Sequence, residues 1–344
     1  MSDEQLQRLV GRSVTVSVPA TIANLGVGYD VLGMAIDERN ELSVRVSGLA
    51  ASGARGDVRL EVRGEGLGEL PTDRRNVAVG AVVRGLAAAG VPNGERLALE
   101  ISALNRIPLA RGLGSSAAAF VAGLFAGAAL AGASGTVDEL PGSCADLFPD
   151  DLTDRLFAAA DDDEGHPDNA AAAIFGGLVA SARVDAVLTA RLVAVPDSAI
   201  PVLMVPDLRL PTSEMRAVLP PRVPMEDAVH NAGRMAAGIA ALEAGDSAGF
   251  ALLADDRLHQ PYRAKRYPAL PALISAAVDA GAVSACLAGA GSAVLAIVDD
   301  ASRVDRVREA MERAAAAAKI GGAARRYDVD HDGVRLEAAA GFGA

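Results

Sequence analysis

A loop rich in glycine and serine, which runs directly into an apolar stretch, constrains this chain more than any other feature. The loop reads Pro-Leu-Ala-Arg-Gly-Leu-Gly-Ser-Ser over residues 108–116, and the apolar stretch continues to Ala131. Glycines let a backbone approach an anion closely, and the helix that follows offers unpaired N–H groups and the positive end of its dipole. The pattern is therefore typical of a phosphate site. The alternative is a turn that caps a buried helix, with Ser115 as its N-cap.

The composition of the loop excludes two common phosphate sites. It is not a lysine-bearing Walker loop, because no lysine follows the glycines, and its spacing is not that of the dinucleotide fingerprint. Only Lys265 and Lys319 are lysines among the 32 basic residues of the chain. Backbone N–H groups, Arg111 or Mg²⁺ must therefore balance the charge of a bound phosphate.

Charge and cysteine content exclude other classes of protein. With 44 acidic and 32 basic residues the net charge is −12, which is the wrong sign for binding nucleic acid or an anionic membrane. Cys144 and Cys286 are the only cysteines, so neither a disulfide framework nor a zinc cluster is expected. The most hydrophobic stretch, residues 117–133, is dominated by alanine and glycine, which favours a buried helix over a membrane span. We expect a cytoplasmic protein without a targeting segment.

Hydrophobic periodicity predicts an α+β chain of two lobes. Strand-like alternation covers residues 14–18, 42–46, 58–62, 97–101 and 202–205, and the early strands are expected to be short and antiparallel. Helices are expected over residues 77–89, 115–131, 151–160, 227–244 and 301–319. We predict an amino-terminal domain of residues 1–170 and a carboxy-terminal domain of residues 171–344, with a cleft between them.

The glycine-serine loop resembles the central motif of the GHMP kinases, Pro-x-x-x-Gly-Leu-Gly-Ser-Ser-Ala. The resemblance implies an amino-terminal lobe like the second domain of ribosomal protein S5, a ferredoxin-like carboxy-terminal lobe, and ATP with Mg²⁺ between them. It assigns Ser116 to Mg²⁺ and places Asn76 near the nucleotide, although an asparagine at a helix start is as readily an N-cap. The residues that would wrap the nucleotide phosphates are Pro108, Leu109, Ala110, Arg111, Gly112, Leu113, Gly114 and Ser115.

A second motif, Pro-Ala-Thr-Ile-Ala-Asn-Leu-Gly-Val-Gly-Tyr-Asp at residues 19–30, resembles the homoserine kinases of this family. Tyr29 stands where the family pattern has phenylalanine. The resemblance assigns Asn24 and Asp30 to the amine end of an amino-acid substrate. Read without the resemblance, these two side chains could simply satisfy their own turn.

The segment Glu-Gly-His-Pro-Asp-Asn at residues 164–169 is also similar to homoserine kinases. The resemblance implies that His166 and Asn169 face the amino acid, with Asn169 near the reacting hydroxyl. Glu164 would be the acidic Mg²⁺ ligand, and Asp161, Asp162 and Asp163 are the alternatives. The segment could otherwise be a turn followed by an N-cap.

Three further motifs complete the resemblance. Thr212 and Arg216 lie four residues apart, so on a helix they share a face. The family pattern places Thr212 between the substrate and the γ-phosphoryl group, and it makes Arg216 and Arg263 a clamp for the substrate carboxylate, which suits the guanidinium fork. The glycine turn of residues 287–295 contributes Gly289 to the substrate site, although its Ser-Ala at 292–293 departs from the usual Pro-Ser or Pro-Thr.

Taken together, the resemblance implies transfer of the ATP γ-phosphoryl group to the side-chain hydroxyl of L-homoserine. Phosphoryl transfer depends on positioning and charge stabilisation, so a strong base is not obligatory. Two alternatives stay open: a GHMP kinase for a mevalonate-like or sugar-like alcohol, and a ligand sensor of the same fold without catalysis. A homodimer is left open as the assembly, and neither nucleic acid nor a membrane is expected as a partner.

Overall fold

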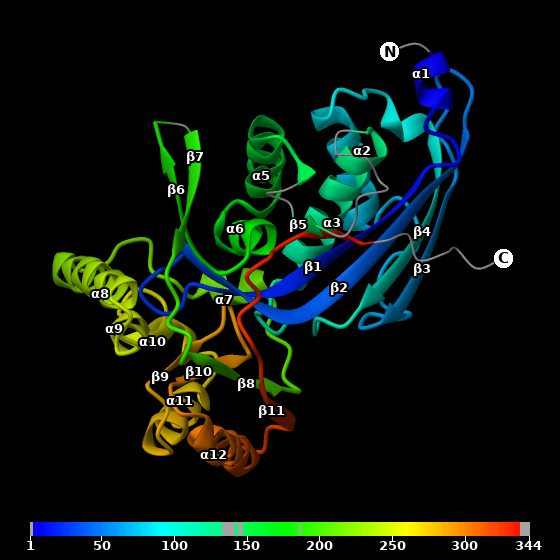
Figure 1. The fold of residues 1–344 in the computed structure, drawn as a ribbon. Coiled ribbons are helices and arrows are strands. Elements are labelled where there is room, and N and C mark those ends of the chain that lie inside the picture. Colours follow the sequence, from blue (N-terminus) through cyan, green and yellow to red (C-terminus); the bar gives the residue numbers. More distant parts are fainter. Residues whose placement is uncertain (1–2, 133–141, 144–146, 186, 338–344) are drawn as a thin grey trace.

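The computed structural model describes residues 3–132, 142–143, 147–185 and 187–337, and these form two lobes, each built on one sheet (Figure 1). The larger lobe has an eight-stranded sheet in which β3, β4, β2, β1, β12 and β5 are consecutive neighbours, and β6 pairs with both β2 and β7. Its strands are β1 (Ser13–Ala23), β2 (Leu32–Leu49), β3 (Val58–Gly64), β4 (Leu97–Asn105), β5 (Gly142–Ser143), β6 (Leu178–Val184), β7 (Val187–Val193) and β12 (Arg335–Glu337).

The early strands lie where the alternation predicted them, but their length and pairing differ from the prediction. β1 has 11 residues and β2 has 18, so neither is short. β3 and β4 pair in parallel, from Val58 opposite Leu99 to Gly64 opposite Asn105. The reason is the connection, since α2 (Val77–Ala88) lies between the two strands and carries the chain back to the same end of the sheet.

Helices cover one face of this sheet. They are α1 (Asp3–Gln7), α2, α3 (Ser115–Leu130), α5 (Asp150–Glu164) and α6 (Asp168–Phe175), with a short 3₁₀ turn, η1 (Gly94–Arg96), before β4. The alanine-rich α3 is the predicted buried helix, and it packs on β1, β2, α2 and α6. It approaches α2 so closely that a Cβ at Gly127 would lie 2.1 Å from the carbonyl oxygen of Val82. Small residues therefore serve helix packing here.

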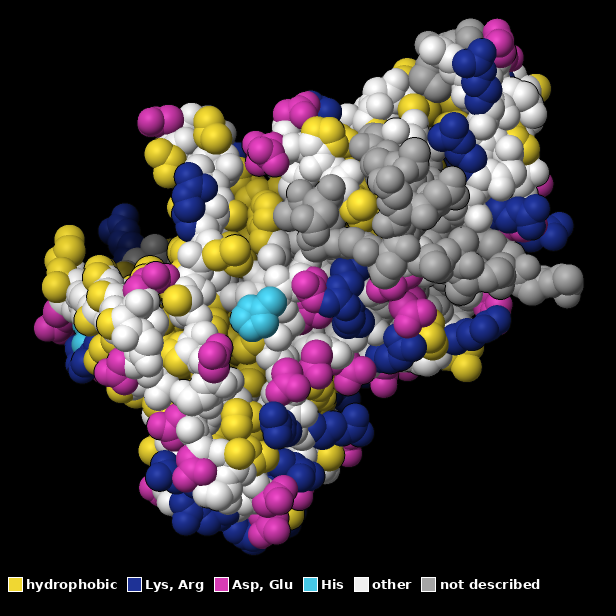
Figure 2. All heavy atoms as spheres, in the orientation of Figure 1, with side chains coloured by type: hydrophobic (Ala, Val, Ile, Leu, Met, Phe, Trp, Pro, Cys, Tyr) yellow, Lys and Arg dark blue, Asp and Glu magenta, His cyan; other side chains and the backbone are white. Residues whose placement is uncertain are grey.

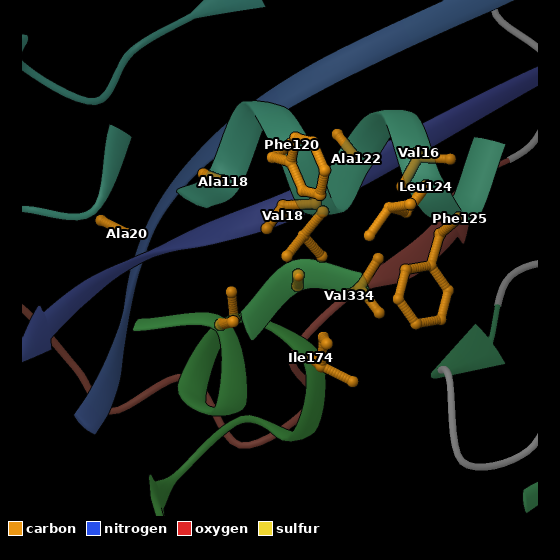
Figure 3. Close-up of a cluster of buried hydrophobic side chains, with 14 of the residues drawn as sticks. Val16, Val18, Ala20, Ala118, Phe120, Ala122, Leu124, Phe125, Ile174 and Val334 are labelled. Atoms are coloured by element: carbon orange, nitrogen blue, oxygen red, sulfur yellow. The ribbon is translucent and has the colours of Figure 1, made fainter. Parts of the chain in front are cut away.

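The core of the larger lobe lies between α3 and the sheet (Figure 3). Phe120 and Leu124 of α3 lie over Val16 and Val18 of β1, and Ile174 of α6 closes the cluster from below. Each of these side chains is at most 3% exposed. The phosphate loop is thus carried on a helix whose own position is fixed by packing.

The smaller lobe is an antiparallel sheet of four strands in the order β11, β8, β10, β9. With one helix packed after the first strand and another before the last, this is the βαββαβ arrangement of a ferredoxin-like fold. Its strands are β8 (Ile200–Pro206), β9 (Ser284–Leu287), β10 (Val294–Val298) and β11 (Gly322–Arg326). Its helices are α7 (Thr212–Ala217), α8 (Met225–Glu243), α9 (Gly249–Ala254), α10 (Gln260–Arg263), α11 (Leu270–Asp279) and α12 (Val304–Ala317), the last preceded by η3 (Ala301–Arg303).

The chain does not pass from one lobe to the other only once. β6, β7 and β12 all follow residue 170, yet they pair within the larger sheet. β12 lies beside β1, with Leu336 opposite Val16. The division at residue 170 stays a prediction, and the carboxy-terminal strand ties the end of the chain to its beginning.

The surface mixes charges of both signs. On the face shown in Figure 2, Lys and Arg side chains are interspersed with Asp and Glu over the smaller lobe. Among the helices of the described residues, none is both long and apolar enough to cross a bilayer.

Candidate active site

Two cavities meet at the glycine-serine loop. The larger has a volume of about 390 Å³ and the smaller about 280 Å³. Ala110, Ser115 and Ser116 line both of them. A ligand that extends through both cavities therefore passes across the loop at the start of α3.

The loop presents an open helix terminus to these cavities. The N-cap of α3 is Gly114, with a left-handed φ of 66°, and no described side chain caps the helix. The alternative that made Ser115 the N-cap is thus wrong, because Ser115 is the first helical residue. A Cβ at position 114 would lie 2.0 Å from Oγ1 of Thr21. Glycine is required there both by conformation and by space.

Arg111 points away from both cavities. Its Nε donates to the carbonyl oxygen of Pro206 at 2.6 Å, and its Nη1 donates to that of Leu109 at 3.2 Å. Burial lowers the pKa of its guanidinium group. Its backbone carbonyl also accepts a hydrogen bond from the N–H of Ala293. Arg111 therefore anchors the loop to the smaller lobe, and its side chain is engaged there rather than in either cavity.

The larger cavity is mostly apolar and lies beside Asn76. Its lining includes Leu42, Val62 and Leu70. Asn76 is the N-cap of α2, since its Oδ1 accepts from the N–H of Ala78 at 3.0 Å, and it also lines the cavity. The two predictions for this residue are thus compatible. A cavity of this size with apolar walls and few polar groups suits the base and sugar of a nucleotide.

The smaller cavity brings together every residue that the sequence assigned to the substrate. Six segments far apart in the chain contribute to it. The assigned residues in its lining are Asn24, Asp30, His166, Asn169, Thr212, Arg216, Arg263 and Gly289. Ser116 lies at its edge, and Thr212 and Arg216 share one face of α7 as predicted.

Asp30 and Arg216 form an ion pair in this cavity. Nη2 of Arg216 donates to Oδ1 of Asp30 at 2.6 Å, and Nη1 lies 3.2 Å from Oδ2. Nη1 also donates to the hydroxyl of Tyr29 at 2.9 Å. Burial is the largest single influence on the pKa of Arg216 and lowers it, but the hydrogen bond and charge of Asp30, together with the smaller effects of Tyr29 and Asp168, outweigh burial, so the pKa is raised. An anion site and a cation site thus lie next to each other and neutralise one another.

Arg263 is held far more tightly than Arg216. It is 1% exposed, and its Nη1 donates to the carbonyl oxygen of Gly289 at 2.8 Å and to Nδ1 of His259 at 3.1 Å. Burial lowers the pKa of Arg263. Nδ2 of Asn24 donates to the same Gly289 carbonyl at 3.0 Å. Gly289 therefore contributes through its backbone, as the point where both lobes meet the cavity.

Two polar pairs orient the remaining side chains. Nδ1 of His166 lies 3.0 Å from Oδ1 of Asp168, and burial opposes but does not cancel the effect of this carboxylate, so the pKa of His166 is raised. The hydroxyl of Thr21 donates to Oδ1 of Asn169 at 2.8 Å, which turns the Asn169 amide N–H₂ group away from Thr21. The sequence motifs include Thr21, Tyr29 and Asp168, but the motifs assigned no role to these three residues.

The acidic metal ligand is only partly constrained by the structure. α5 ends at Glu164, whose side chain lies outside the described residues. Asp161 is paired with Arg183, and Oδ1 of Asp163 lies 3.4 Å from Arg84. Within the described residues, the lining of both cavities is formed without either of these two carboxylates.

Two family models match this chain, one in the larger lobe and one in the smaller lobe. Residues 76–177 match the family model of the GHMP kinases N terminal domain, and residues 239–318 match that of the GHMP kinases C terminal. Together with relatives of more than 30% identity, these matches show that the chain belongs to the GHMP kinase family.

Within the family, the relatives of this chain include several homoserine kinases. A homoserine kinase of Moorella thermoacetica is 38% identical over 281 residues, which is 82% of this chain and 86% of that protein. One of Streptomyces avermitilis is 36% identical and covers 94% of this chain and 95% of its own. The crystal structure of homoserine kinase from Cytophaga hutchinsonii superposes with a TM-score of 0.78 at 27% identity, over 94% and 97% of the two chains. L. major mevalonate kinase, at 15% identity and a TM-score of 0.61, shares the fold.

Proposed function

We propose that this protein transfers the γ-phosphoryl group of ATP to the side-chain hydroxyl of L-homoserine, giving O-phospho-L-homoserine for threonine biosynthesis. The observation that supports this most strongly is the smaller cavity, where Asp30, Arg216 and Arg263 lie beside the phosphate loop. A carboxylate and two guanidinium groups match the ammonium and carboxylate groups of a free α-amino acid. The relatives named above are homoserine kinases.

ATP would bind across both cavities. Its base and sugar would occupy the larger one beside Asn76, and its phosphates would lie on the open N–H groups of the loop at Gly112, Gly114 and Ser115. The net charge of −12 makes this local field necessary, because the chain as a whole repels an anionic nucleotide. ATP is supplied in the cytoplasm, and we place the reaction there.

Ser116 offers a hard oxygen donor for Mg²⁺ at the loop. The exposed hydroxyl of Ser116 lines both cavities, and hard oxygen donors of this kind suit the ion. We assign Ser116 and Glu164 as the residues that would hold it. When bound, Mg²⁺ supplies neutralisation of the phosphate oxygens.

Positioning by the chain's own residues accounts for the rest of the chemistry. Asp30 would take the substrate ammonium group, and Arg216 and Arg263 its carboxylate, which directs the side-chain hydroxyl toward Asn169 and Thr212 at the loop. The Asn169 amide is oriented by Thr21 and can bind that hydroxyl. Asp30 is held by Arg216, so its role is charge rather than proton transfer. The reaction is a direct transfer between two bound substrates.

The test is ADP release with a panel of alcohols in the presence of ATP and Mg²⁺. L-Homoserine should be turned over, whereas 4-hydroxybutyrate and 3-amino-1-propanol, which each lack one charged group, should be turned over at least a hundredfold less efficiently. Serine, threonine, mevalonate and galactose complete the panel. Preferred turnover of mevalonate or galactose would overturn the homoserine assignment, and tight homoserine binding without ADP release would favour the sensor.

A further inference from the structure

Tyr29 lies between the two arginines of the substrate cavity, and neither the family pattern nor the reaction accounts for its hydroxyl. The centre of its ring is 5.6 Å from Cζ of Arg216 and 5.4 Å from Cζ of Arg263. Its hydroxyl accepts a hydrogen bond from Nη1 of Arg216 at 2.9 Å. One aromatic residue thus contacts both guanidinium groups, at distances typical of cation–π pairs.

The ring of Tyr29 is itself fixed by the smaller lobe. It packs on the imidazole of His259, with ring centres 5.3 Å apart and a tilt of 34°. His259 is fully buried and bridges the lobes, since its Nε2 lies 2.8 Å from the carbonyl oxygen of Gly26 and its Nδ1 accepts from Arg263. The hydroxyl therefore meets Arg216 from a support that does not depend on substrate.

Substrate binding requires Arg216 to exchange partners. In the structure Arg216 is bound to Asp30 through two contacts. A zwitterionic amino acid can enter only if its ammonium group takes over Asp30 and its carboxylate takes over Arg216. During this exchange Nη1 of Arg216 would lose the Asp30 oxygen, but the Tyr29 hydroxyl, 2.9 Å away, would remain within reach. Without that tether a guanidinium group with a half-exposed side chain regains rotamer freedom, which must be lost again on binding.

We propose that Tyr29 is a positioning residue that holds Arg216 in its carboxylate-binding orientation while the Asp30–Arg216 pair is exchanged for the two charges of the substrate. The inference rests on the proposed function, because it takes a free α-amino acid as the ligand. The phenylalanine of the family pattern would retain the ring and its contacts with both arginines. The hydroxyl is thus an addition of this chain, which should tighten binding of the amino acid and leave the chemical step unchanged.

The test compares Tyr29→Phe with Tyr29→Leu in steady-state kinetics at saturating ATP. Loss of one hydrogen bond to a charged group should raise the KM for homoserine about tenfold to a hundredfold in Tyr29→Phe, with kcat and the KM for ATP within twofold of wild type. Tyr29→Leu, which also removes the ring, should raise the homoserine KM further. Tyr262→Phe is the matched control, because the ring of Tyr262 also contacts a cation, Lys265, but this cation does not line the cavity, whereas Arg216 and Arg263 do.

Two results would overturn the proposal. A homoserine KM within twofold of wild type in Tyr29→Phe would show that the hydroxyl does not position Arg216. A lower kcat together with raised KM values for both substrates and a lower unfolding midpoint would show a merely structural role. If Tyr29→Leu fails to fold, Tyr29→Phe alone carries the test. Absence of homoserine turnover in the wild type would instead contradict the proposed function, so the two failures are distinguishable.

Discussion

Arg216 and Arg263, to which two sequence motifs give the same role in binding the substrate carboxylate, differ in their physical surroundings. The Arg216 side chain is 36% exposed and meets its partners from the cavity wall, whereas Arg263 is almost fully buried and donates to a carbonyl of Gly289 and one of Met215. A buried acceptor that loses its donor is not compensated by water. Removal of either arginine should weaken substrate binding, but only the removal of Arg263 should also lower the free energy of unfolding.

Arg216→Ala and Arg263→Ala test this difference. Arg216→Ala should raise the KM for homoserine about tenfold to a hundredfold, leave the KM for ATP nearly unchanged, and change the free energy of unfolding by less than about 1 kcal/mol. Arg263→Ala should weaken homoserine binding as well and lower the free energy of unfolding by about 2–4 kcal/mol. Urea titration and kinetics on both variants measure the split. Equal stability of the two variants would contradict the assignment, and unchanged homoserine kinetics in both would refute the clamp.

The His166–Asp168 pair makes a prediction about pH. The pKa of His166 is raised above its usual 6.5 because the hydrogen bond and charge of Asp168 outweigh burial. Stability from this pair is therefore complete below about pH 6.5 and is lost as the pH rises through the raised pKa. Asp168→Asn should lower the His166 pKa, since burial then dominates. NMR titration of the imidazole C–H signals measures this, and an unmoved midpoint in Asp168→Asn would show that another group sets the pKa.

At the scale of elements, the start of α3 decides whether the loop can take phosphate. Gly114 holds a left-handed conformation against Thr21, which in turn orients Asn169. Gly114 thus connects the N-terminus of α3 with the side-chain amide of Asn169, the proposed contact for the substrate hydroxyl.

Gly114→Ala should therefore damage both ligand sites at once. The added methyl group would overlap the Thr21 hydroxyl in a backbone conformation that alanine rarely adopts, so we expect a loss of kcat/KM of about a hundredfold or more. Gly80→Ala on α2 is the control, because a Cβ there has nothing within 4 Å and alanine favours the helix by about 0.5–1 kcal/mol. ADP release and thermal unfolding on both variants decide it; near wild-type activity in Gly114→Ala would show that the loop tolerates movement.

The regular elements could be predicted because their signals are local. The alternation of residues 14–18 and the apolar stretch after the loop both depend on neighbours in the chain, and β1 and α3 formed at these positions, although β1 extends further, to Ala23. The parallel pairing of β3 with β4 and the return of β12 to β1 are set by partners tens to hundreds of residues away. The eight residues that the motifs assigned to the substrate also lie in one cavity. The motifs could not show that Asp30 and Arg216 bind each other, or that Arg111 donates to the carbonyl of Pro206.

For the whole molecule, a buried cation binds the segment that leads into β12. Arg39 of β2 is paired with Asp330 and donates to the carbonyl oxygens of Ser17 and Gly333. The Arg39 and Asp330 side chains are 15% and 5% exposed. The segment that leads into β12 is therefore bound to the middle of the larger sheet through this arginine.

Arg39→Leu should destabilise the protein substantially. It leaves the Asp330 carboxylate buried without its cation, which costs about 3–5 kcal/mol in similar cases. Arg63→Leu is the matched control, because its pair with Glu61 is about 60% exposed, and solvent-exposed ion pairs of this kind contribute little to stability. Urea unfolding of the two variants gives the difference, and a loss below 1 kcal/mol in Arg39→Leu would show that β12 is held by other contacts.

The contact between the lobes around His259 should make the protein less stable on mild acidification. Burial outweighs the charge of Asp256 and lowers the pKa of His259 to about 4, and the nearby charge of Arg263 acts in the same direction as burial. Between about pH 4 and 6.5 the unfolded chain binds a proton at this histidine and the folded chain does not, so the free energy of unfolding should fall as the pH falls, by at most about 1.4 kcal/mol per pH unit. The pKa of Asp256 is itself lowered, and its own loss lies below its usual 3.8. Because His166 acts in the opposite direction at higher pH, stability should be greatest near pH 6.5. Urea titrations from pH 4 to 8 measure the curve, and His259→Asn should flatten its acidic side; an acidic slope that survives this substitution would assign the effect to carboxylates elsewhere.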